Sequence, residues 1–245
     1  MDPLTAVAAG GLRSRMESLE MLANNIANAS TGGYKSDREF YSLYMAPDVD
    51  LETDLVDPAT MPVIERNWTD FSQGVLTNTG NPLDLALSGS GFFLVDGPSG
   101  PLYTRNGSFR LSKDGRLVTM DGYPVHEAAG GNLQFQGSGP ISVSSDGTVS
   151  QDGNVVGQIA IRDLPAAGLV KRGSNYFVPA DPSLQPTMAD ATVEQGQLEA
   201  SNAGSAESAV RLIGIMRQFE MLQKAVSLGM EMNQQAVQNV ARVGS

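Results

Sequence analysis

The sequence of 245 residues contains no cysteine and a single histidine, and both absences limit its chemistry. Without cysteine the chain can form neither a disulfide bond nor a thiolate metal site. One histidine rules out a metal centre built from several imidazoles and leaves a single histidine candidate for a general base. Lack of cysteine is compatible with an exported protein and also with a cytosolic one. The composition therefore offers little for metal or thiol chemistry.

Positive charge and long apolar runs are also scarce. Sixteen basic residues stand against 27 acidic ones, and the formal net charge of −11 argues against a nucleic-acid partner. No run approaches the roughly 20 apolar residues of a membrane-spanning helix, so we expect no membrane insertion. The 41% content of hydrophobic residues is typical of an ordered globular protein.

The first residues do not resemble a cleavable secretory signal. Before Leu12 the chain carries Asp2 and no basic residue, and its longest apolar run is Ala6 to Ala9. A secretory signal needs a basic start and a longer apolar segment. If the protein leaves the cytoplasm, we expect it to do so without a cleaved signal peptide.

Each end of the chain carries an apolar stripe with helical spacing. The C-terminal stripe has alternating steps of three and four residues and is interrupted only by two amides; it comprises Ala209, Leu212, Met216, Phe219, Gln223, Val226, Met230, Asn233, Val237 and Val240. No proline occurs from Ser205 to Val240, so roughly 36 residues can form one helix of about 54 Å. The N-terminal stripe comprises Leu12, Met16, Leu19, Ala23 and Ile26. Each stripe needs an apolar partner, and the nearest candidate is the other stripe.

The boundaries of the N-terminal helix and of the segment after it follow from local signals. Asp2 and Pro3 form a favourable helix start, and Gly32-Gly33 stops the helix near Ala29. Five acidic residues without a base lie between positions 48 and 57, flanked by prolines. We therefore expect an extended, solvated connector over 31–70.

The central region has the pattern of β structure. Six Asp-Gly or Asn-Gly pairs separate short strand-like runs between Phe71 and Gln195, and such pairs favour tight hairpins. The sequence therefore predicts an α+β fold. Helices at 1–30 and 205–245 form a discontinuous, coiled-coil-like helical domain, the connector covers 31–70, and a mainly antiparallel β domain covers 71–204.

No motif indicates catalysis. His126 has no serine or cysteine nucleophile motif nearby, so a surface or strand-end histidine is expected. Gly89-Ser90-Gly91 fits a bend before a buried strand and not a phosphate-binding loop. The Asp-Gly pairs lack the spacing of a calcium loop. A carboxylate pair of the glycosidase type stays open, although no pair stands out. We expect no enzyme activity, no catalytic, metal or cofactor-binding residue, and no small-molecule substrate.

Several motifs resemble those of bacterial flagellar rod and hook proteins. At the N-terminal end, residues 23–28 (ANNIAN) and 31–35 (TGGYK) match the family's helix end and the turn after it. The similarity continues, in order, at 74–87, 91–93, 103–109, 121–125 and 196–202. The chain departs from the family pattern at Gly33 and at 203–205, where the family usually continues with Val-Asp. Arg217-Gln218-Phe219-Glu220 and the modest length are more like the proximal-rod F-type subunit than the distal-rod G-type subunit.

This resemblance implies a structural role. Such subunits pair their terminal helices around the rod's central channel, carry the β domain outside, transmit torque, and are exported unfolded by the flagellar type III apparatus. The implied partners are copies of the chain, other rod proteins and that apparatus, and the implied location is the rod across the periplasm. The implied assembly interface comprises Leu12, Met16, Leu19, Ile26, Asn24, Asn25, Asn28, Leu212, Met216, Phe219, Val226, Met230 and Val237.

The three asparagines have two possible roles in the sequence: hydrogen bonding between subunits, and simple capping of a helix end. Three other functions are alternatives to a proximal-rod subunit: a distal-rod subunit, a peptidoglycan hydrolase and a soluble periplasmic binding module.

Overall fold

The computed structural model describes residues 3–45, 60–137 and 139–243, so the acidic stretch at 48–57 lies outside the described residues. The chain divides into two compact units. The first, here called the helical unit, comprises residues 1–27, 37–69 and 204–245. The second, the β unit, comprises residues 28–36 and 70–203. In sequence the β unit is inserted between parts of the helical unit, which confirms the α+β organisation expected from the sequence.

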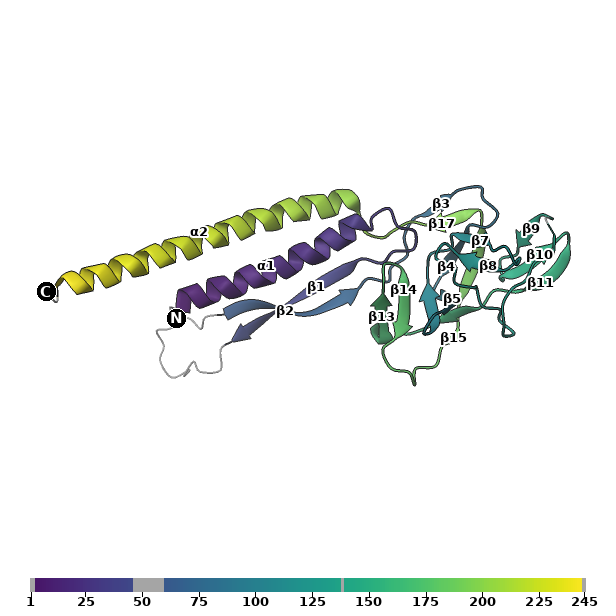
Figure 1. Ribbon diagram of the computed structural model, residues 1–245, viewed down its shortest axis with the longest axis horizontal. Coiled ribbons are helices and arrows are strands. Elements are labelled where there is room, and N and C mark those ends of the chain that lie inside the picture. Colours follow the sequence, from purple (N-terminus) through teal and green to yellow (C-terminus); the bar gives the residue numbers. More distant parts are fainter. Residues whose placement is uncertain (1–2, 46–59, 138, 244–245) are drawn as a thin grey trace. The chain divides into compact units, whose positions relative to one another are not determined.

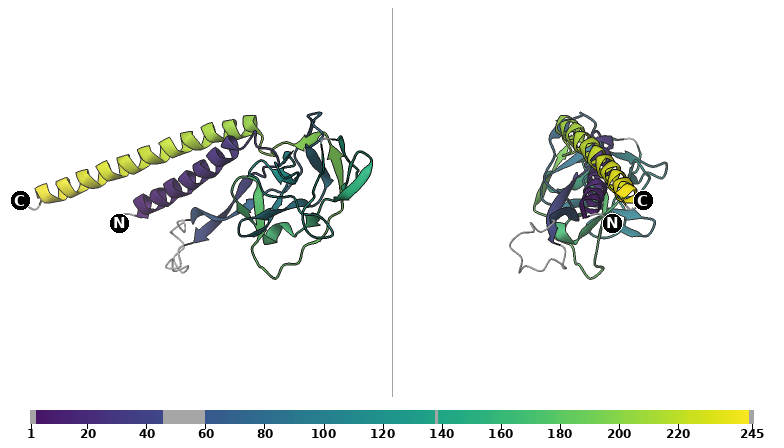
Figure 2. Two further views of the ribbon diagram at one scale, coloured as in Figure 1. Left: turned by 45° about the vertical axis from the view of Figure 1, so that its right-hand side comes forward. Right: turned by 90° about the vertical axis from the view of Figure 1, so that its left-hand side faces the viewer.

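The helical unit contains helices α1 (Pro3–Ala27) and α2 (Ser205–Val243) and strands β1 (Asp37–Met45) and β2 (Thr60–Thr69). The helices lie side by side and antiparallel (Figures 1 and 2), and Gly11 of α1 packs against Leu222 of α2. Helix α1 also contacts β1 and β2. Neither described helix carries an apolar stretch long enough to cross a bilayer.

Strands β1 and β2 lie within the segment expected to be an extended connector. They pair antiparallel from Asp37 opposite Thr69 to Met45 opposite Thr60, with an irregularity after Phe40. The difference has a physical reason, because these segments are rich in aromatic and β-branched residues that favour strands. Proline 62 is compatible with a strand here, since both strands of a two-stranded ladder are edges.

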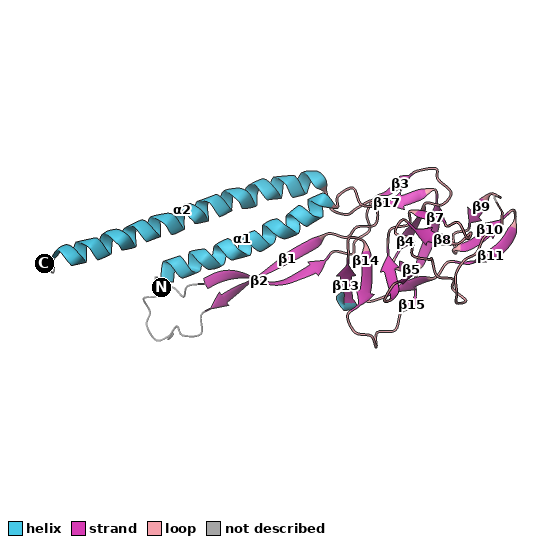
Figure 3. Ribbon diagram, in the orientation of Figure 1, coloured by secondary structure: helices cyan, strands magenta, loops and turns pink. Residues whose placement is uncertain are grey.

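The β unit consists of short strands (Figure 3). The first eight are β3 (Leu76–Asn78), β4 (Leu85–Gly89), β5 (Phe92–Gly97), β6 (Gly100–Thr104), β7 (Phe109–Leu111), β8 (Leu117–Thr119), β9 (Ile141–Val143) and β10 (Thr148–Gln151). The others are β11 (Asn154–Gln158), β12 (Ile161–Asp163), β13 (Leu169–Arg172), β14 (Tyr176–Pro179), β15 (Thr187–Met188), β16 (Ala191–Gln195) and β17 (Gln197–Glu199). A short 3-10 helix covers Ala166–Gly168.

The described strands of the β unit pair antiparallel. A six-stranded sheet has the order β13-β14-β6-β5-β12-β15, and a three-stranded sheet has the order β11-β10-β9. The pairs β16-β4, β17-β3 and β7-β8 complete the unit. At the turn between β10 and β11, Asp152 and Gly153 have φ values of 53° and 80°, which is the hairpin geometry that an Asp-Gly pair favours.

The β unit has its own hydrophobic core in two clusters. Successive side chains of a strand point to opposite faces, so the neighbours Phe93 and Phe92 on β5 enter different clusters. Phe93 packs edge-on against Phe109 in the larger cluster, with ring centroids 5.2 Å apart. Phe92 lies in the smaller cluster with Phe177, and both rings contact Phe71. The β unit therefore buries its apolar residues within itself.

Candidate assembly surface

The buried face of α1 consists of small and polar residues. Its members recur at steps of three or four residues and are Gly11, Ser14, Ser18, Leu22 and Asn25. Small side chains allow neighbouring backbones to approach closely. The apolar stripe expected from the sequence lies on an adjoining face of α1. There Leu12, Leu19 and Ile26 are half-buried, Ala23 is exposed, and Met16 is 53% exposed.

The face of α2 that packs on α1 is here called the inner face. It comprises Ser208, Leu212, Ile215, Phe219, Leu222, Val226 and Gly229. Leu212, Phe219 and Val226 also belong to the stripe expected from the sequence. Two methionines of that stripe, Met216 and Met230, are 49% and 58% exposed. The side chain of Val237, a further member of the stripe, is not among those that the structure describes. The expected stripe is thus rotated from the inner face and only partly coincides with it.

The three asparagines of the ANNIAN motif differ in environment. Asn25 donates from Nδ2 to the carbonyl of Asp37 at 2.8 Å and accepts from the Asp37 amide at 3.0 Å, so its side chain pairs with β1 as a backbone would. Asn28 accepts from the Thr31 hydroxyl at 3.3 Å and from its amide at 3.0 Å. Asn24 is exposed. Asn25 and Asn28 therefore hold the turn that follows α1.

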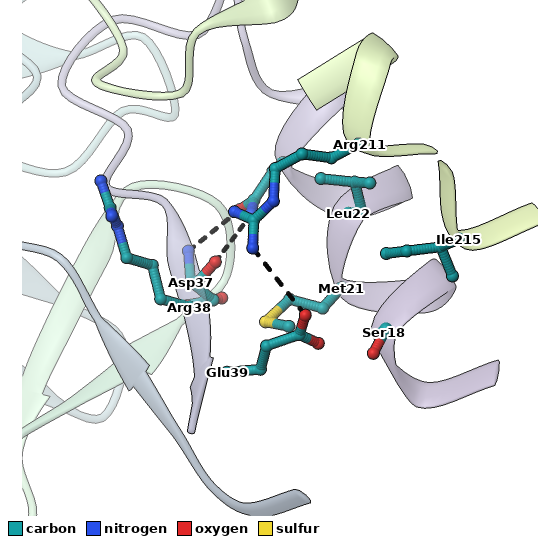
Figure 4. Close-up of a pocket in the computed structure, with 9 residues that line it drawn as sticks. Ser18, Met21, Leu22, Asp37, Arg38, Glu39, Arg211 and Ile215 are labelled. Atoms are coloured by element: carbon teal, nitrogen blue, oxygen red, sulfur yellow. Dashed lines mark hydrogen bonds and ion pairs between the residues drawn. The ribbon is translucent and has the colours of Figure 1, made fainter. Parts of the chain in front are cut away.

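A small cavity lies between α1, β1 and α2 (Figure 4). Glu39 and Arg211 approach each other there to 3.9 Å, and Leu22 and Ile215 supply apolar walls. The Glu39 side chain is 6% exposed, and its Oε2 atom has no hydrogen-bond partner among the described residues. The cavity volume of about 10 Å3 suffices for about one water molecule. The cavity lies where the three elements pack together, and it is far too small for a substrate or cofactor.

A second apolar stripe follows another side of α2 and is here called the outer seam. The outer seam comprises Val210, Gly214, Met221, Ala225, Leu228 and Met232. These residues are three, four or seven positions apart, which is the spacing of a heptad repeat. The four large side chains of the outer seam are 58–71% exposed. Seven of the fourteen exposed large hydrophobic residues among the described ones lie on α2, so the exposed apolar surface is concentrated on this helix.

The β unit shows no constellation for catalysis in its described part. The His126 Nδ1 atom lies 3.0 Å from the carbonyl oxygen of Glu127, and its Nε2 lies 3.7 Å from Asp96 Oδ1. No group of three or more His, Cys, Asp or Glu side chains among the described residues is arranged to hold a metal ion. A shallow groove of about 490 Å3 is lined by Arg105 and Asp163. Asp163 accepts hydrogen bonds from the Ser90 hydroxyl and the Leu164 amide, so its carboxylate serves the fold.

A buried charge cluster in the β unit has no counterpart in the functional residues expected from the sequence. Lys35 Nζ donates to Glu199 Oε1 at 2.5 Å and to the Ser72 carbonyl at 2.7 Å. Arg105 Nη1 lies 3.4 Å from Glu199 Oε2, and the Gly74 amide donates to Glu199 Oε1. Burial lowers the pKa of Lys35 and of Arg105, and the neighbouring Glu199 opposes this effect in both.

Fold and surface together define a class of protein. A self-contained β unit is combined with long helices whose apolar residues are only partly covered, which is the organisation of a structural subunit and not of an enzyme built around a pocket.

Family profiles agree with this class along the chain. Residues 6–35 match "Flagella basal body rod protein", residues 86–156 match "Flagellar hook protein FlgE/F/G D1 domain", and residues 194–239 match "Flagellar basal body rod FlgEFG protein C-terminal".

Curated relatives extend the similarity to nearly the whole chain. The flagellar basal-body rod protein FlgF of Caulobacter vibrioides is 33% identical over 99% of this chain and 100% of its own length. FlgF of Mesorhizobium japonicum is 31% identical over 82% of this chain and 83% of its own. FlgG of Agrobacterium fabrum is 32% identical over 93% of this chain and 95% of its own length. The chain therefore belongs to the flagellar basal-body rod protein family, which is structural and not enzymatic.

Proposed function

We propose that the chain is a subunit of the proximal part of the flagellar rod and polymerises through α1 and α2. The outer seam carries this proposal, because it is a heptad-spaced apolar stripe that no described part of the subunit covers. Similarity to proteins named FlgF over nearly the whole chain supports the proximal position. A distal position, as for the relatives named FlgG, is the second candidate.

The physical basis of polymerisation is burial of the outer seam. A helix with apolar residues on more than one side is typical of a buried helix. Covering apolar surface stabilises by about 25 cal/mol per Å2, which offsets the entropy lost when the helices order. Methionine side chains such as Met221 and Met232 adapt to irregular surfaces, which suits contacts with non-identical neighbours in a helical shaft.

In this proposal each subunit uses two kinds of helical contact. Within the subunit, the inner face of α2 and the buried face of α1 form a coiled-coil-like pair. Between subunits, the outer seam joins the expected interface residues that remain accessible on α1 and α2, among them Met16, Asn24, Met216 and Met230. Many such helices around one channel would share the torque and leave a passage for exported subunits.

The proposed partners are copies of this chain, other rod proteins and the flagellar type III export apparatus. The proposed location is the rod where it spans the periplasm, reached without cleavage of a signal peptide. Membership of the rod family and similarity to both FlgF and FlgG relatives support contact with more than one kind of rod subunit. No nucleic acid, membrane insertion, cofactor or small-molecule substrate is part of the proposal.

Aspartate substitutions in the outer seam test the proposal directly. Met221→Asp and Leu228→Asp would place a charge in the inter-subunit contact, whereas Ser227→Asp adds the same charge to an exposed polar position of the same helix. We expect the first two variants to be stable as purified proteins but absent from purified hook–basal bodies, with motility lost. Ser227→Asp should assemble. Normal motility in Met221→Asp and Leu228→Asp would contradict the proposed surface.

Inner-face variants separate contacts within the subunit from contacts between subunits. Leu212→Asp and Phe219→Asp place a charge on the face of α2 that packs on α1. We expect both to prevent rod incorporation and to leave the β unit folded, because that unit has its own core. In contrast to the outer-seam variants, they should also lower the helix content of the purified chain, which circular dichroism measures.

Position within the rod is tested by immunogold electron microscopy of hook–basal bodies with an antibody against the β unit. Label close to the inner-membrane ring is expected for a proximal subunit. Label confined to the distal rod would keep the family and overturn the position. Absence of label, with the protein free in the periplasm, would favour a soluble binding module instead.

A further inference from the structure

The chain segment after α1, residues Asn28–Ser36, belongs to the β unit and is here called the strap. We infer that a buried charge cluster clasps the strap onto the β unit, and that this clasp sets the register in which α1 pairs with α2. The positioning residues are Lys35, Glu199, Arg105 and Asn202. The inference concerns the folding of a single subunit, so it stands whether or not the outer seam mediates assembly.

Backbone hydrogen bonds tie the strap to the segment that precedes α2. The Gly33 amide donates to the Glu199 carbonyl at 2.8 Å, and the Asn202 amide donates to the Tyr34 carbonyl at 3.3 Å. The side chain of Asn202 accepts from the Ser36 amide at 2.7 Å. Gly33 lies six residues after the last residue of α1 (27 to 33), and Glu199 lies six residues before the first residue of α2 (199 to 205). The two helices are therefore tethered by short segments of equal length.

Side chains of the strap are buried as deeply as core residues. Tyr34 and Lys35 are both 0% exposed. The Lys171 Nζ atom lies 4.4 Å from the Tyr34 ring centroid and donates to the Lys35 carbonyl at 2.7 Å. Burial of Tyr34 and Lys35 therefore gives the end of the strap that precedes β1 a defined position within the β unit.

Charge balance makes Glu199 the central residue of the clasp. Its carboxylate faces two buried cations, Lys35 on the strap and Arg105 after β6. Removing one partner of a buried ion pair leaves an uncompensated charge in a low-dielectric site, which is strongly destabilising. Glu199→Gln would remove the strongest counter-charge of both cations and leave only the weaker influence of Asp70 on Lys35 and of Asp163 on Arg105, whereas Lys35→Met would leave Arg105 and Glu199 paired. The two substitutions should therefore differ greatly in effect.

Helix packing alone does not define the register. The inner face of α2 repeats an apolar residue every seven positions, at Leu212, Phe219 and Val226, and again at Ile215 and Leu222. A slip of seven residues against α1 would still place an apolar residue at most contacts, as in coiled coils with uniform seams. Contacts outside the two helices must therefore contribute to the choice of register. Glu39 of β1, 3.9 Å from Arg211, is one such contact, and the clasp adds to it because it holds both tethers at fixed points.

A disulfide scan measures the register directly, because the chain contains no cysteine of its own. A Cβ atom at Gly11 would lie 3.5 Å from Leu222 Cδ1, so Gly11→Cys with Leu222→Cys reports the observed register. Gly11→Cys with Gly229→Cys reports a slip of one heptad. Oxidation also traps pairings that form only briefly, so the two double variants are compared by their initial rates of disulfide formation. The ratio of these rates reports the register even if the helices fluctuate.

In the otherwise unaltered chain we expect the in-register disulfide to form at least about tenfold more readily than the slipped one, the ratio that a modest bias between two states gives. Glu199→Gln should reduce the preference to within about twofold. Glu194→Gln removes a less buried carboxylate on β16, the strand that precedes β17 in the sequence, and should leave the preference for the in-register disulfide unchanged. Equal preference in Glu199→Gln and in the unaltered chain, or no preference in either, would overturn the inference.

Hydrogen exchange shows whether the clasp acts locally. In Glu199→Gln we expect the amides of Gly33 to Ser36 to lose protection while those of β5 and β6 keep it. Lys35→Met should show a smaller loss at the same amides. If Glu199→Gln unfolds the whole β unit, Lys35→Met carries the test. Loss of protection throughout the unit in both variants, or unchanged protection of the strap, would overturn a local clasp. Neither readout requires rod assembly, so failure here is distinguishable from failure of the proposed function.

Discussion

The two units of the chain expose apolar side chains in different ways. In the β unit, the exposed large hydrophobic residues stand singly on separate strands and turns; they are Val75, Met120, Val155, Val170 and Met188. On α2 such residues follow one another along the helix, at heptad spacing in the outer seam. Scattered apolar residues are normal on a protein surface, whereas an aligned stripe indicates a missing partner. The pattern of exposure, more than its amount, therefore distinguishes a finished domain from an assembling one.

The units also differ in what they bury. The β unit encloses aromatic rings and a buried cluster in which Glu199 pairs with Lys35 and Arg105. The helical unit buries Leu22 and Ile215, but the buried face of α1 otherwise consists largely of Gly11, Ser14 and Ser18, which contribute little apolar area. We therefore propose that the β unit is stable by itself and that the helical unit needs its neighbours.

The largest expected loss of stability comes from a substitution in the core of the β unit. Phe93 is 0% exposed and packs on Phe109, so Phe93→Ala should cost about 3–5 kcal/mol of unfolding free energy. Denaturant unfolding followed by circular dichroism measures this loss. The single tryptophan, Trp68 on β2, gives a separate fluorescence signal for the helical unit. A cost below about 1 kcal/mol would contradict an independent core at this position.

A glycine substitution in the strap should come next in size. Gly33 has a φ of 67°, and an added Cβ would lie 2.3 Å from the backbone nitrogen of Asn106. Gly33→Ala therefore combines backbone strain of about 1–3 kcal/mol with a steric clash. Gly80→Ala is the matched control, because its φ is 69° and an added Cβ meets nothing within 4 Å. Equal melting temperatures for the two variants would show that the strap is not closely packed.

Alkaline pH should weaken the β unit through Tyr176. Burial, together with a hydrogen bond to Asp121, raises the pKa of the Tyr176 hydroxyl well above its usual value of 10.0. Above pH 10 the unfolded chain loses this proton while the folded chain keeps it, so folded stability falls as pH rises, by up to about 1.4 kcal/mol per pH unit. Below pH 10 the contribution is fully present.

The Tyr176→Phe variant tests this pH dependence. It removes the ionisable hydroxyl, so we expect it to lose less stability than the unaltered chain between pH 10 and pH 11. Between pH 7 and pH 9 the two stability curves should run parallel. Parallel curves above pH 10 as well would contradict the role given to Tyr176.

The smallest expected effect on stability sharpens the comparison most. Met188 on β15 is 89% exposed and Leu228 on α2 is 58% exposed. Met188→Ser and Leu228→Ser should each change the stability of the purified protein by no more than about 0.5 kcal/mol, as surface substitutions usually do. We expect only Leu228→Ser to reduce recovery of the protein in hook–basal bodies. Equal recovery of both variants would remove the distinction between scattered and aligned exposure.

Local sequence patterns were sufficient for the elements at both ends. Helix α1 ends at Ala27, close to the expected Ala29, and a turn in which the Thr31 amide donates to the Asn28 carbonyl follows it. Helix α2 begins at Ser205, the residue at which the sequence predicted the start of the C-terminal helix. The Asp152-Gly153 hairpin follows from the φ values that these residues tolerate.

Features that depend on distant residues were not accessible from the sequence. The stripe of largest residues on α1 is not its buried face, because close packing against α2 selects Gly11, Ser14 and Ser18 instead. Lys35 and Glu199 are 164 positions apart, so nothing near either residue indicates a buried pair. A lysine in a glycine-rich loop reads locally as exposed.

Hydrogen exchange of the full chain at micromolar concentration tests the central claim most directly. The claim is that the β unit is stable alone and the helical unit is completed by neighbours. We expect the amides of β4 to β6 to be protected for hours, and those of α2 beyond Val226 to exchange within seconds, because most of the described side chains there are exposed in the single subunit. Protection of α2 equal to that of the β unit in the unassembled chain would contradict the account.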